Sequence, residues 1–310
     1  MRNALTRAET MLRAACGERL RTSFPMVPLT TFRIGGPAAL YLEPESDRDL
    51  AAVSEAVRET AIDVVVIGKG SNVLVSDLGF DGLVLRLGRR FRWTGRDGDR
   101  LTGGGAMPLP ALSGVALSHG LAGLEFAVAI PASLGGAVKM NAGAHGRSLA
   151  DVVERVDVYL LQEGRVAPIP AAAAGFSYRR TTLPQGAVVT GATLRLVRGD
   201  RAEIRSLMDD AREWRRRTQP LAEPNCGSVF KNPEGDHAAR LIEAAGGKGT
   251  WVGGAAISGK HANFIVAGEG ACATDVVTLI RRVQDLVEAR FGIHLEPEVR
   301  FVGDFDLAPR

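Results

Sequence analysis

The most constraining feature of this chain is a predicted strand that ends in a glycine-rich loop and continues as another strand. Residues 64–67 are four consecutive β-branched residues, which is typical of a buried strand. They run into the loop GKGSN (68–72), and a β pattern resumes over residues 73–75. In a Rossmann turn the glycines open a helix, and a Walker A loop has a different spacing. We therefore expect neither of these two nucleotide-binding folds.

The sequence before this loop predicts a β-α-β unit. Residues 38–42 form a short apolar run, and a helix that buries Leu50, Val53 and Val57 precedes the strand at 64–67. Further along, residues 83–197 carry many short strand patterns separated by glycines, with a hairpin around Glu163-Gly164. The remaining elements are a helix at 109–119, a helix from about Asp200 to before Pro220, a helix at 237–245, a strand at 263–267, a helix capped by Thr274 that ends at Gly292, and a final strand at 293–301. We expect that last strand to return to the earlier body of the protein.

Composition narrows the functional classes. The 310 residues are 45% hydrophobic and 24% charged, with no apolar run near the roughly 20 residues that a membrane helix needs. The first residues lack the apolar core of a secretory signal, so we expect a cytoplasmic protein. A net charge of +3 does not indicate a nucleic-acid partner, and the run 215–217 of three arginines is typical of a solvated helix end. Three separated cysteines and five scattered histidines predict no metal site.

Three glycine clusters in the first half of the chain point to an anionic ligand. They are the loop 68–72, Gly103-Gly104-Gly105 and the segment IPASLGGAVKMNAGAHG (130–146). Glycine lets backbone N–H groups converge on an anion such as a diphosphate, because it reaches positive φ and leaves room for close approach. Tight turns need glycine too, so each cluster alone leaves both interpretations open.

Seven segments, taken in order, resemble one known family. They are TTFRIGGPA (30–38), GKGSNVLVSD (68–77), LEFAVAIPASLGGAVKMNAGAHG (124–146), FSYRR (176–180), CGSVFKNP (226–233), LIEAAGGKG (241–249) and LEPEVRFVG (295–303). Together they resemble the UDP-N-acetylenolpyruvoylglucosamine reductase (MurB) family of bacterial peptidoglycan synthesis. The resemblance implies an α+β, FAD-binding fold of the vanillyl-alcohol-oxidase type. It implies FAD-binding subdomains at 1–76 and 77–199, a substrate-binding domain at 200–291, and a C-terminal segment at 292–310 that returns to the FAD-binding part.

The resemblance also implies a reaction and its catalytic residues. NADPH reduces a non-covalent FAD, and hydride from flavin N5 reduces the enolpyruvyl group of UDP-N-acetylglucosamine enolpyruvate to the lactyl ether. Arg179 matches the arginine that stabilises the negative charge developing on the substrate, a task that suits a fixed guanidinium. Ser228 matches the proton donor, and Glu298 matches the glutamate beside them. Taken singly, each of the three also fits an ordinary structural role.

The remaining site residues follow from the same resemblance and from the glycine clusters. The expected cofactor-binding residues are Arg33, Gly68, Lys69, Gly70, Ser71, Asn72, Gly103, Gly104, Gly105, Pro131, Ser133, Gly135, Gly136, Asn141 and Gly143. The expected substrate-binding residues are Tyr178, Lys231, Asn232 and Lys248. No second dinucleotide motif is visible, so NADPH and substrate are expected to use one cleft in turn. We expect a monomer or a weak oligomer.

The chain departs from the family pattern in two places. Ala129 and Ala132 stand where the flavin segment GIPGS commonly has glycines, and the added methyl groups fit only if φ is negative there. The segment between Lys231 and His237 has no room for the inserted tyrosine loop of the longer family type. The chain therefore resembles the shorter type, and Cys226 is interpreted as a packing residue.

Two other functions stay open at this point. One is a different oxidoreductase on the same flavin scaffold, such as a sugar or lactone oxidase with a histidine linked covalently to flavin. His119 and His145 are the histidines of the flavin half, and neither lies in the segment expected for such a link. The other is a non-catalytic sensor that retains flavin or nucleotide. The three matched catalytic positions argue against the sensor.

Overall fold

The β-α-β unit at the start of the chain forms as its sequence predicts. In the computed structural model, which describes residues 2–305, strand β2 (Pro37–Leu42) leads to helix α2 (Asp47–Thr60) and then to strand β3 (Val64–Val66). Ser46 is the N-cap, and its hydroxyl accepts a hydrogen bond from the N–H of Asp49. Leu50, Val53 and Val57 are buried, so one face of α2 supplies apolar core.

The chain divides into two compact units, each made of three segments. Unit 1 comprises Met1–Thr22, Leu40–Lys69 and Gly82–Arg215, and unit 2 comprises Ser23–Ala39, Gly70–Asp81 and Arg216–Arg310. Strands β1 (Arg21–Pro25), β2 and β5 (Phe80–Leu85) each begin in one unit and end in the other. The domain boundaries expected after residues 76, 199 and 291 stay a prediction.

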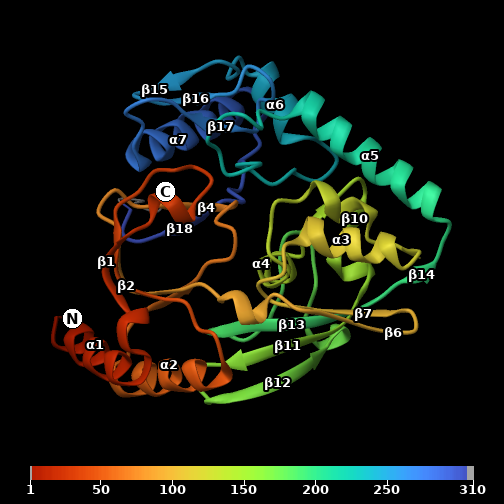
Figure 1. Cartoon of the computed structure of the whole chain (residues 1–310). Coiled ribbons are helices and arrows are strands. Elements are labelled where there is room, and N and C mark those ends of the chain that lie inside the picture. The colour runs from red at the N-terminus through yellow and green to blue at the C-terminus, as the bar shows by residue number, and fades with distance from the viewer. Residues whose placement is uncertain (1, 306–310) are drawn as a thin grey trace. The chain divides into compact units, whose positions relative to one another are not determined.

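Unit 1 contains most of the secondary structure. Its other elements are α1 (Arg2–Cys16), β6 (Thr94–Asp97), β7 (Arg100–Gly104), α3 (Leu109–Ser118), β8 (Leu121–Ala122), α4 (Leu134–Lys139), β9 (Gly143–Ala144), β10 (Arg147–Ser148), β11 (Val153–Leu160), β12 (Arg165–Pro170), β13 (Ala187–Arg195), β14 (Val197–Arg198) and most of α5 (Arg201–Thr218). Five strands form an antiparallel sheet in the order β12-β11-β13-β7-β6, and Figure 1 shows α1 and α2 lying along each other. The expected hairpin around Glu163-Gly164 joins β11 to β12.

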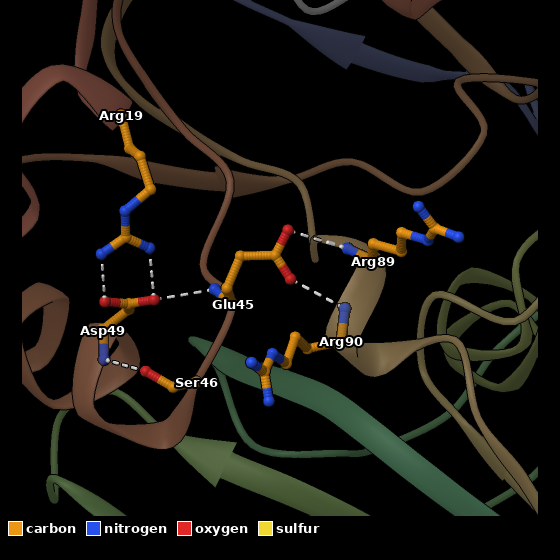
Figure 2. A network of polar contacts seen from close by, with 6 residues as sticks. All are labelled: Arg19, Glu45, Ser46, Asp49, Arg89 and Arg90. Carbon is orange, nitrogen blue, oxygen red and sulfur yellow. Dashed lines mark hydrogen bonds and ion pairs between the residues drawn. The ribbon is translucent and has the colours of Figure 1, made fainter.

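A polar network fixes the start of α2 within unit 1 (Figure 2). The guanidinium of Arg19 donates two hydrogen bonds to the Asp49 carboxylate, at 2.6 and 2.7 Å. Asp49 also accepts from the N–H of Glu45, whose own carboxylate accepts from the N–H groups of Arg89 and Arg90 at 3.1 and 2.7 Å. The loop before α2 is thereby connected to two other parts of the unit.

Unit 2 is built around one long helix and a small sheet. Its elements are β4 (Val73–Val75), α6 (Ala238–Ala244), β15 (Trp251–Val252), β16 (Ala255–Ile257), β17 (Ile265–Ala267), α7 (Ala273–Phe291) and β18 (Arg300–Val302). Strands β15, β16 and β17 are antiparallel neighbours, and α6 and α7 lie beside them in Figure 1. Val276, Ile280, Val283 and Val287 of α7 are buried, as the apolar spacing predicts.

The C-terminal segment returns as expected, but its strand β18 (Arg300–Val302) is much shorter than the predicted strand at 293–301. The N-cap of α7 also differs from the prediction. β18 pairs in parallel with β4, with Val302 opposite Val75. The N-cap of α7 is Cys272 and not Thr274. Cys272 forms a capping box with Asp275, whose carboxylate accepts from the N–H of Cys272 at 3.2 Å. Asp77, from a distant segment, accepts from the N–H groups of Ala273 and Thr274 at 2.7 and 2.9 Å. Within residues 2–305, no helix combines the length and apolar character required to cross a membrane.

Candidate functional site

The glycine loop that follows β3 is free to bind an anion. No described residue accepts a hydrogen bond from the backbone N–H groups of residues 68–72. The loop is fixed instead through its carbonyl groups, since the Gly70 oxygen accepts from the N–H of Thr31 at 3.1 Å. Gly70 is buried at φ +63°, and a Cβ there would lie 2.0 Å from the carbonyl oxygen of Leu29. Backbone N–H groups that have no partner within the chain can donate to an anion, so this loop fits an anionic ligand.

The charges around the loop agree with that interpretation. Burial lowers the pKa of Lys69 below its ordinary value, and the positive charges of Arg92 and Arg86 lower it further. An anion bound near these positive charges would reduce their repulsion of Lys69. The residues of this loop therefore fit the phosphates of a dinucleotide cofactor.

The glycines at 103–105 serve a different purpose in the structure. The N–H of Gly104 donates to the carbonyl of Trp93 at 2.9 Å, and the N–H of Gly105 donates to Thr190 at 2.7 Å. A Cβ on Gly105 would lie 2.0 Å from the carbonyl oxygen of Val189. Close packing of backbones explains the glycines here, so their contact with a cofactor stays a prediction.

Ser133 brings the glycine loop and helix α4 together inside unit 1. The Ser133 hydroxyl accepts a hydrogen bond from the N–H of Gly136 at 3.3 Å and caps α4. A Cβ on Gly68 would lie 2.2 Å from the same hydroxyl, so the loop passes directly against this cap. The N–H of Gly135 already donates to the carbonyl of Gly105 at 2.9 Å.

The other expected cofactor residues have mixed surroundings. The side-chain amide of Asn141 is occupied inside unit 1: it accepts from the N–H of Ala150 at 2.9 Å and donates to the Ser177 carbonyl at 2.8 Å. Pro131 is exposed and Gly143 pairs with Ser148. Arg33 is exposed in unit 2 at φ +58°. The two alanines that replace family glycines, Ala129 and Ala132, are both free of positive φ, so their methyl groups cause no backbone strain.

Arg179 lies in a tight two-residue turn of unit 1. Ser177 and Arg180 exchange two backbone hydrogen bonds, of 3.0 and 3.1 Å, and Tyr178 and Arg179 form the tip between them. Arg179 has φ +56°, a conformation that costs a non-glycine residue about 1–2 kcal/mol. Its guanidinium carbon lies 5.2 Å from the centre of the Tyr178 ring, and Tyr178 is 53% exposed.

Ser228 lies in a well-ordered bend of unit 2. Gly227, at φ +81°, donates its N–H to the side-chain oxygen of Asn225 at 2.9 Å. Val229, on the other side, donates its N–H to the carbonyl of Asn263 at 2.9 Å. The Ser228 hydroxyl is half-buried, and no group of the described chain hydrogen-bonds it. This hydroxyl is thus available to a ligand.

Glu298 lies next to the Ser228 bend. Its N–H donates to the carbonyl of Val229 at 2.7 Å, and its own carbonyl accepts from the side chain of Asn72 at 3.1 Å. Burial raises the pKa of the Cys226 thiol, and the negative charge of Glu298 raises it further. Unit 2 therefore brings together the Asn72 end of the glycine loop, the Ser228 bend and Glu298, while Arg179 belongs to unit 1.

The expected substrate residues of unit 2 have partners within the chain. Lys231 forms an ion pair with the exposed Glu296, and Lys248 forms one with Glu243 at 3.0 Å. The side-chain oxygen of Asn232 accepts from the N–H of Ala238 at 3.0 Å, at the start of α6. These contacts neither establish nor exclude substrate binding, which stays a prediction.

Asn263 is a buried residue of the site that sequence reasoning missed. It is 4% exposed, and its side chain bonds both backbone groups of Phe230, two residues after Ser228. The signal in the sequence is weak, an amide residue just before an apolar strand. The part of the chain from 2 to 305 contains no group of three His, Cys, Asp or Glu side chains that could hold a metal ion.

Comparison with family models matches both parts of the chain. Residues 38–169 match a model described as an FAD binding domain. Residues 219–302 match a model described as the C-terminal domain of UDP-N-acetylenolpyruvoylglucosamine reductase.

Similar proteins extend the match to nearly the whole chain. A UDP-N-acetylenolpyruvoylglucosamine reductase of Anaeromyxobacter sp. (strain Fw109-5) is 47% identical over 289 residues, covering 93% of this chain and 90% of that protein. The corresponding reductase of Heliobacterium modesticaldum is 47% identical over 282 residues, covering 90% of each. The crystal structure of the same enzyme from Thermus caldophilus superposes with a TM-score of 0.80 at 36% identity, covering 91% of this chain and 99% of that one.

Proposed function

Because the chain belongs to the UDP-N-acetylenolpyruvoylglucosamine reductase family, we infer that it is an FAD-dependent UDP-N-acetylmuramate dehydrogenase of peptidoglycan precursor synthesis. It uses NADPH to reduce the enolpyruvyl group of UDP-N-acetylglucosamine enolpyruvate to the lactyl ether. The observation that supports this most strongly is identity of 47% to a reductase over 93% of the chain. The unpartnered loop amides support the cofactor part of the proposal.

The glycine loop would hold the FAD phosphates. The N–H groups of residues 68–72 donate to them, and the Lys69 ammonium adds a positive charge. When bound, FAD carries hydride from NADPH to the substrate, which no side chain of the protein can do. The remaining chemistry, stabilising charge and supplying a proton, belongs to the protein.

Arg179 would stabilise the negative charge that develops on the substrate carboxylate. A guanidinium suits this task because it is always charged and can donate two parallel hydrogen bonds to a carboxylate. The tight turn and the neighbouring Tyr178 ring limit its freedom before substrate arrives, so little reorganisation is needed. Tyr178 would contact the substrate from the same turn.

Ser228 would donate the proton that completes the reduction. Hydride addition to the terminal methylene leaves a strongly basic carbon beside the ether oxygen, and even a weakly acidic hydroxyl can protonate it if correctly placed. The Ser228 hydroxyl has no partner in the described chain that would compete for its proton. Lys231 lies three residues further on and would favour the resulting alkoxide, while Glu298 stands beside the donor on the neighbouring segment.

The substrate diphosphate would bind the two lysines of unit 2. Lys231 and Lys248 each have a carboxylate partner with an exposed side chain, Glu296 and Glu243. Such exposed ion pairs are worth little, so a diphosphate can replace the carboxylates at small cost. Asn232 would add a hydrogen bond from its amide, whose oxygen already holds the start of α6.

The experiment that tests this function separates its two half-reactions in the variant Ser228→Ala. Under anaerobic conditions, NADPH should bleach the bound flavin within about twofold of the wild-type rate. Reoxidation of the reduced flavin by the enolpyruvyl nucleotide should be about 100- to 10,000-fold slower, the usual range for losing a general acid. Stopped-flow absorbance measures both.

Ser113→Ala is the matched control, because that buried serine donates to the Leu124 carbonyl at 2.9 Å in unit 1. It should change neither half-reaction by more than about twofold, since it removes no group from the site. Equal losses in both half-reactions of Ser228→Ala would contradict the donor role. Wild-type protein that retains flavin after acid precipitation would instead indicate an oxidase with a covalent cofactor.

A further inference from the structure

The buried side-chain amide of Asn263 bonds the backbone next to the Ser228 bend in the way that a neighbouring strand would. Its side-chain oxygen accepts from the N–H of Phe230 at 2.9 Å, and its side-chain nitrogen donates to the carbonyl of Phe230 at 2.8 Å. Its backbone carbonyl accepts from the N–H of Val229 at 2.9 Å. One residue thus bonds three backbone groups within two positions of Ser228. A neighbouring strand would make the same kind of contacts.

Asn263 is itself held in place. Its backbone N–H donates to the Nδ1 atom of His261 at 3.3 Å, and the His261 ring packs edge-on against Phe264. Burial and then the positive charge of Lys248 lower the pKa of His261 below its ordinary value. The two bonds to Phe230 give the side-chain amide of Asn263 one orientation, because its oxygen must accept and its nitrogen must donate.

The opposite side of the bend is bonded to the C-terminal segment. The N–H of Glu298 donates to the carbonyl of Val229 at 2.7 Å, and the N–H of Lys231 donates to the carbonyl of Glu296 at 2.9 Å. Residues 229–231 accordingly have partners on both sides, as a central strand has. Since the Ser228 hydroxyl makes no hydrogen bond within the described chain, the backbone beside it fixes the Cβ from which the hydroxyl extends.

We propose that Asn263 is a positioning residue for proton transfer, fixing the backbone after Ser228 so that its hydroxyl faces the carbon to be protonated. This inference rests on the proposed role of Ser228 as donor. An amide suits the position because it pairs with a backbone N–H and a backbone carbonyl at once. A leucine offers neither partner, and an aspartate carboxylate offers only the acceptor. Small displacements of a catalytic group are costly, because its transfer geometry is lost.

The variant Asn263→Ala tests the proposal. Flavin reduction by NADPH should stay within about twofold of wild type, while reoxidation by the enolpyruvyl nucleotide should fall by about 10- to 100-fold. The solvent deuterium isotope effect on reoxidation should rise, because proton transfer becomes slower relative to the other steps. A purely structural role would reduce the amount of folded enzyme without increasing that isotope effect.

Asn263→Asp keeps the side-chain volume and the acceptor for the Phe230 N–H, replaces the donor to the Phe230 carbonyl with an oxygen, and adds a negative charge. It carries the test if the alanine variant does not fold. It should show the same selective loss in reoxidation. Ser258→Ala is the matched control: this serine is also buried in unit 2, and it accepts from the N–H of Lys260 at 3.2 Å, away from Phe230. It should leave both half-reactions within about twofold of wild type.

The outcomes separate this inference from the proposed function. Suppose that Ser228→Ala shows the selective loss, while both Asn263 variants either slow the two half-reactions equally or slow neither of them. The positioning role of Asn263 is then wrong, and the donor role of Ser228 stands. An unchanged solvent isotope effect in both Asn263 variants also overturns it. If Ser228→Ala itself lacks the selective loss, the donor assignment fails first.

Discussion

The bend that carries Arg179 and the bend that carries Ser228 are held in opposite ways. The Arg179 turn is closed by its own backbone, through the two hydrogen bonds between Ser177 and Arg180. The Ser228 bend takes most of its bonds from chain segments far away in sequence, Asn263 on one side and Glu298 on the other. One bend is determined locally, and the other exists only once unit 2 has folded.

The two bends also differ in backbone strain. Arg179 has φ +56°, a region that suits glycine, whereas Ser228 itself is not among the residues with positive φ. Strain at a functional residue persists only where surrounding bonds enforce it, and here the short turn enforces it. Ser228 is free of this strain because segments on both sides of its bend define the path of the backbone. Changes in distant residues should therefore affect Ser228 more than Arg179.

After Ser228→Ala itself, the largest effect in this comparison should come from replacing the strained Arg179 with glycine. Arg179→Gly removes the guanidinium, and reoxidation of reduced flavin by the enolpyruvyl nucleotide should slow by about 100- to 1000-fold. The free energy of unfolding should stay within about 1 kcal/mol of wild type, because glycine adopts φ +56° without the penalty that arginine has. Stopped-flow absorbance and denaturant titration measure the two quantities.

Arg180→Gly is the control for this change, since Arg180 is exposed, follows Arg179 directly and has no positive φ. It should lose about 0.5–1 kcal/mol of stability and keep its activity, the reverse of the first variant. If both variants lose stability alike and keep activity, Arg179 has no catalytic role and its strained turn has another origin.

The same contrast explains how much of the fold the sequence could predict. Helix α2 was predictable, because Ser46 caps it and its buried residues repeat at helical spacing within one short segment. The N-cap of α7 was predicted two residues too late: Cys272 caps the helix in a capping box with Asp275, which the sequence analysis did not consider. The second contribution, from Asp77 nearly 200 residues away, leaves no trace in the sequence beside the helix.

The candidate site follows the same rule. The loop 68–72 was predictable as a connection between two strands from its own short segment, and its binding of an anion stays a prediction. The glycines at 103–105 looked equivalent, yet a Cβ on Gly105 would meet the carbonyl of Val189 and a Cβ on Gly104 that of Phe91. Asn263 was missed for a related reason: its meaning depends on Phe230, and no short pattern joins the two.

An intermediate effect should come from Asn141, which connects the Arg179 turn to the rest of unit 1. Asn141→Ala removes the donor to the Ser177 carbonyl and the acceptor for the Ala150 N–H, both with a buried side chain. We expect a loss of about 1–3 kcal/mol in the free energy of unfolding, because two partly buried hydrogen bonds are lost. Reoxidation should slow by about tenfold or less, since the turn keeps its own two bonds.

This result is to be compared with Asn263→Ala under the same conditions. If the two bends differ as described, the variant at 263 should lose more of its reoxidation rate for each kcal/mol of stability lost. Equal ratios, measured by denaturant titration and stopped-flow absorbance, would show that the Arg179 turn depends on distant residues as much as the Ser228 bend does.

The smallest effect should be the loss of stability on lowering the pH, caused by the hydrogen-bond network around Asp49. Hydrogen bonds from Arg19 lower the pKa of Asp49 below its ordinary value, so the carboxylate contributes stability above that value and loses it as the pH falls through the lowered pKa. The contribution is about 1 kcal/mol or less, because the Arg19 side chain is 43% exposed and water screens the pair. Thermal unfolding of wild type and Asp49→Asn should therefore differ near neutral pH and converge in strong acid.

Glu59→Gln, at an exposed ion pair with Arg7, is the control and should show no such difference. If the unfolding temperatures converge in acid and both half-reaction rates of Asp49→Asn are unchanged, the network contributes to stability alone. A selective loss of reoxidation would show instead that the Arg179 turn responds to this distant part of unit 1. The distinction between a bend held locally and a bend held by distant segments would then fail.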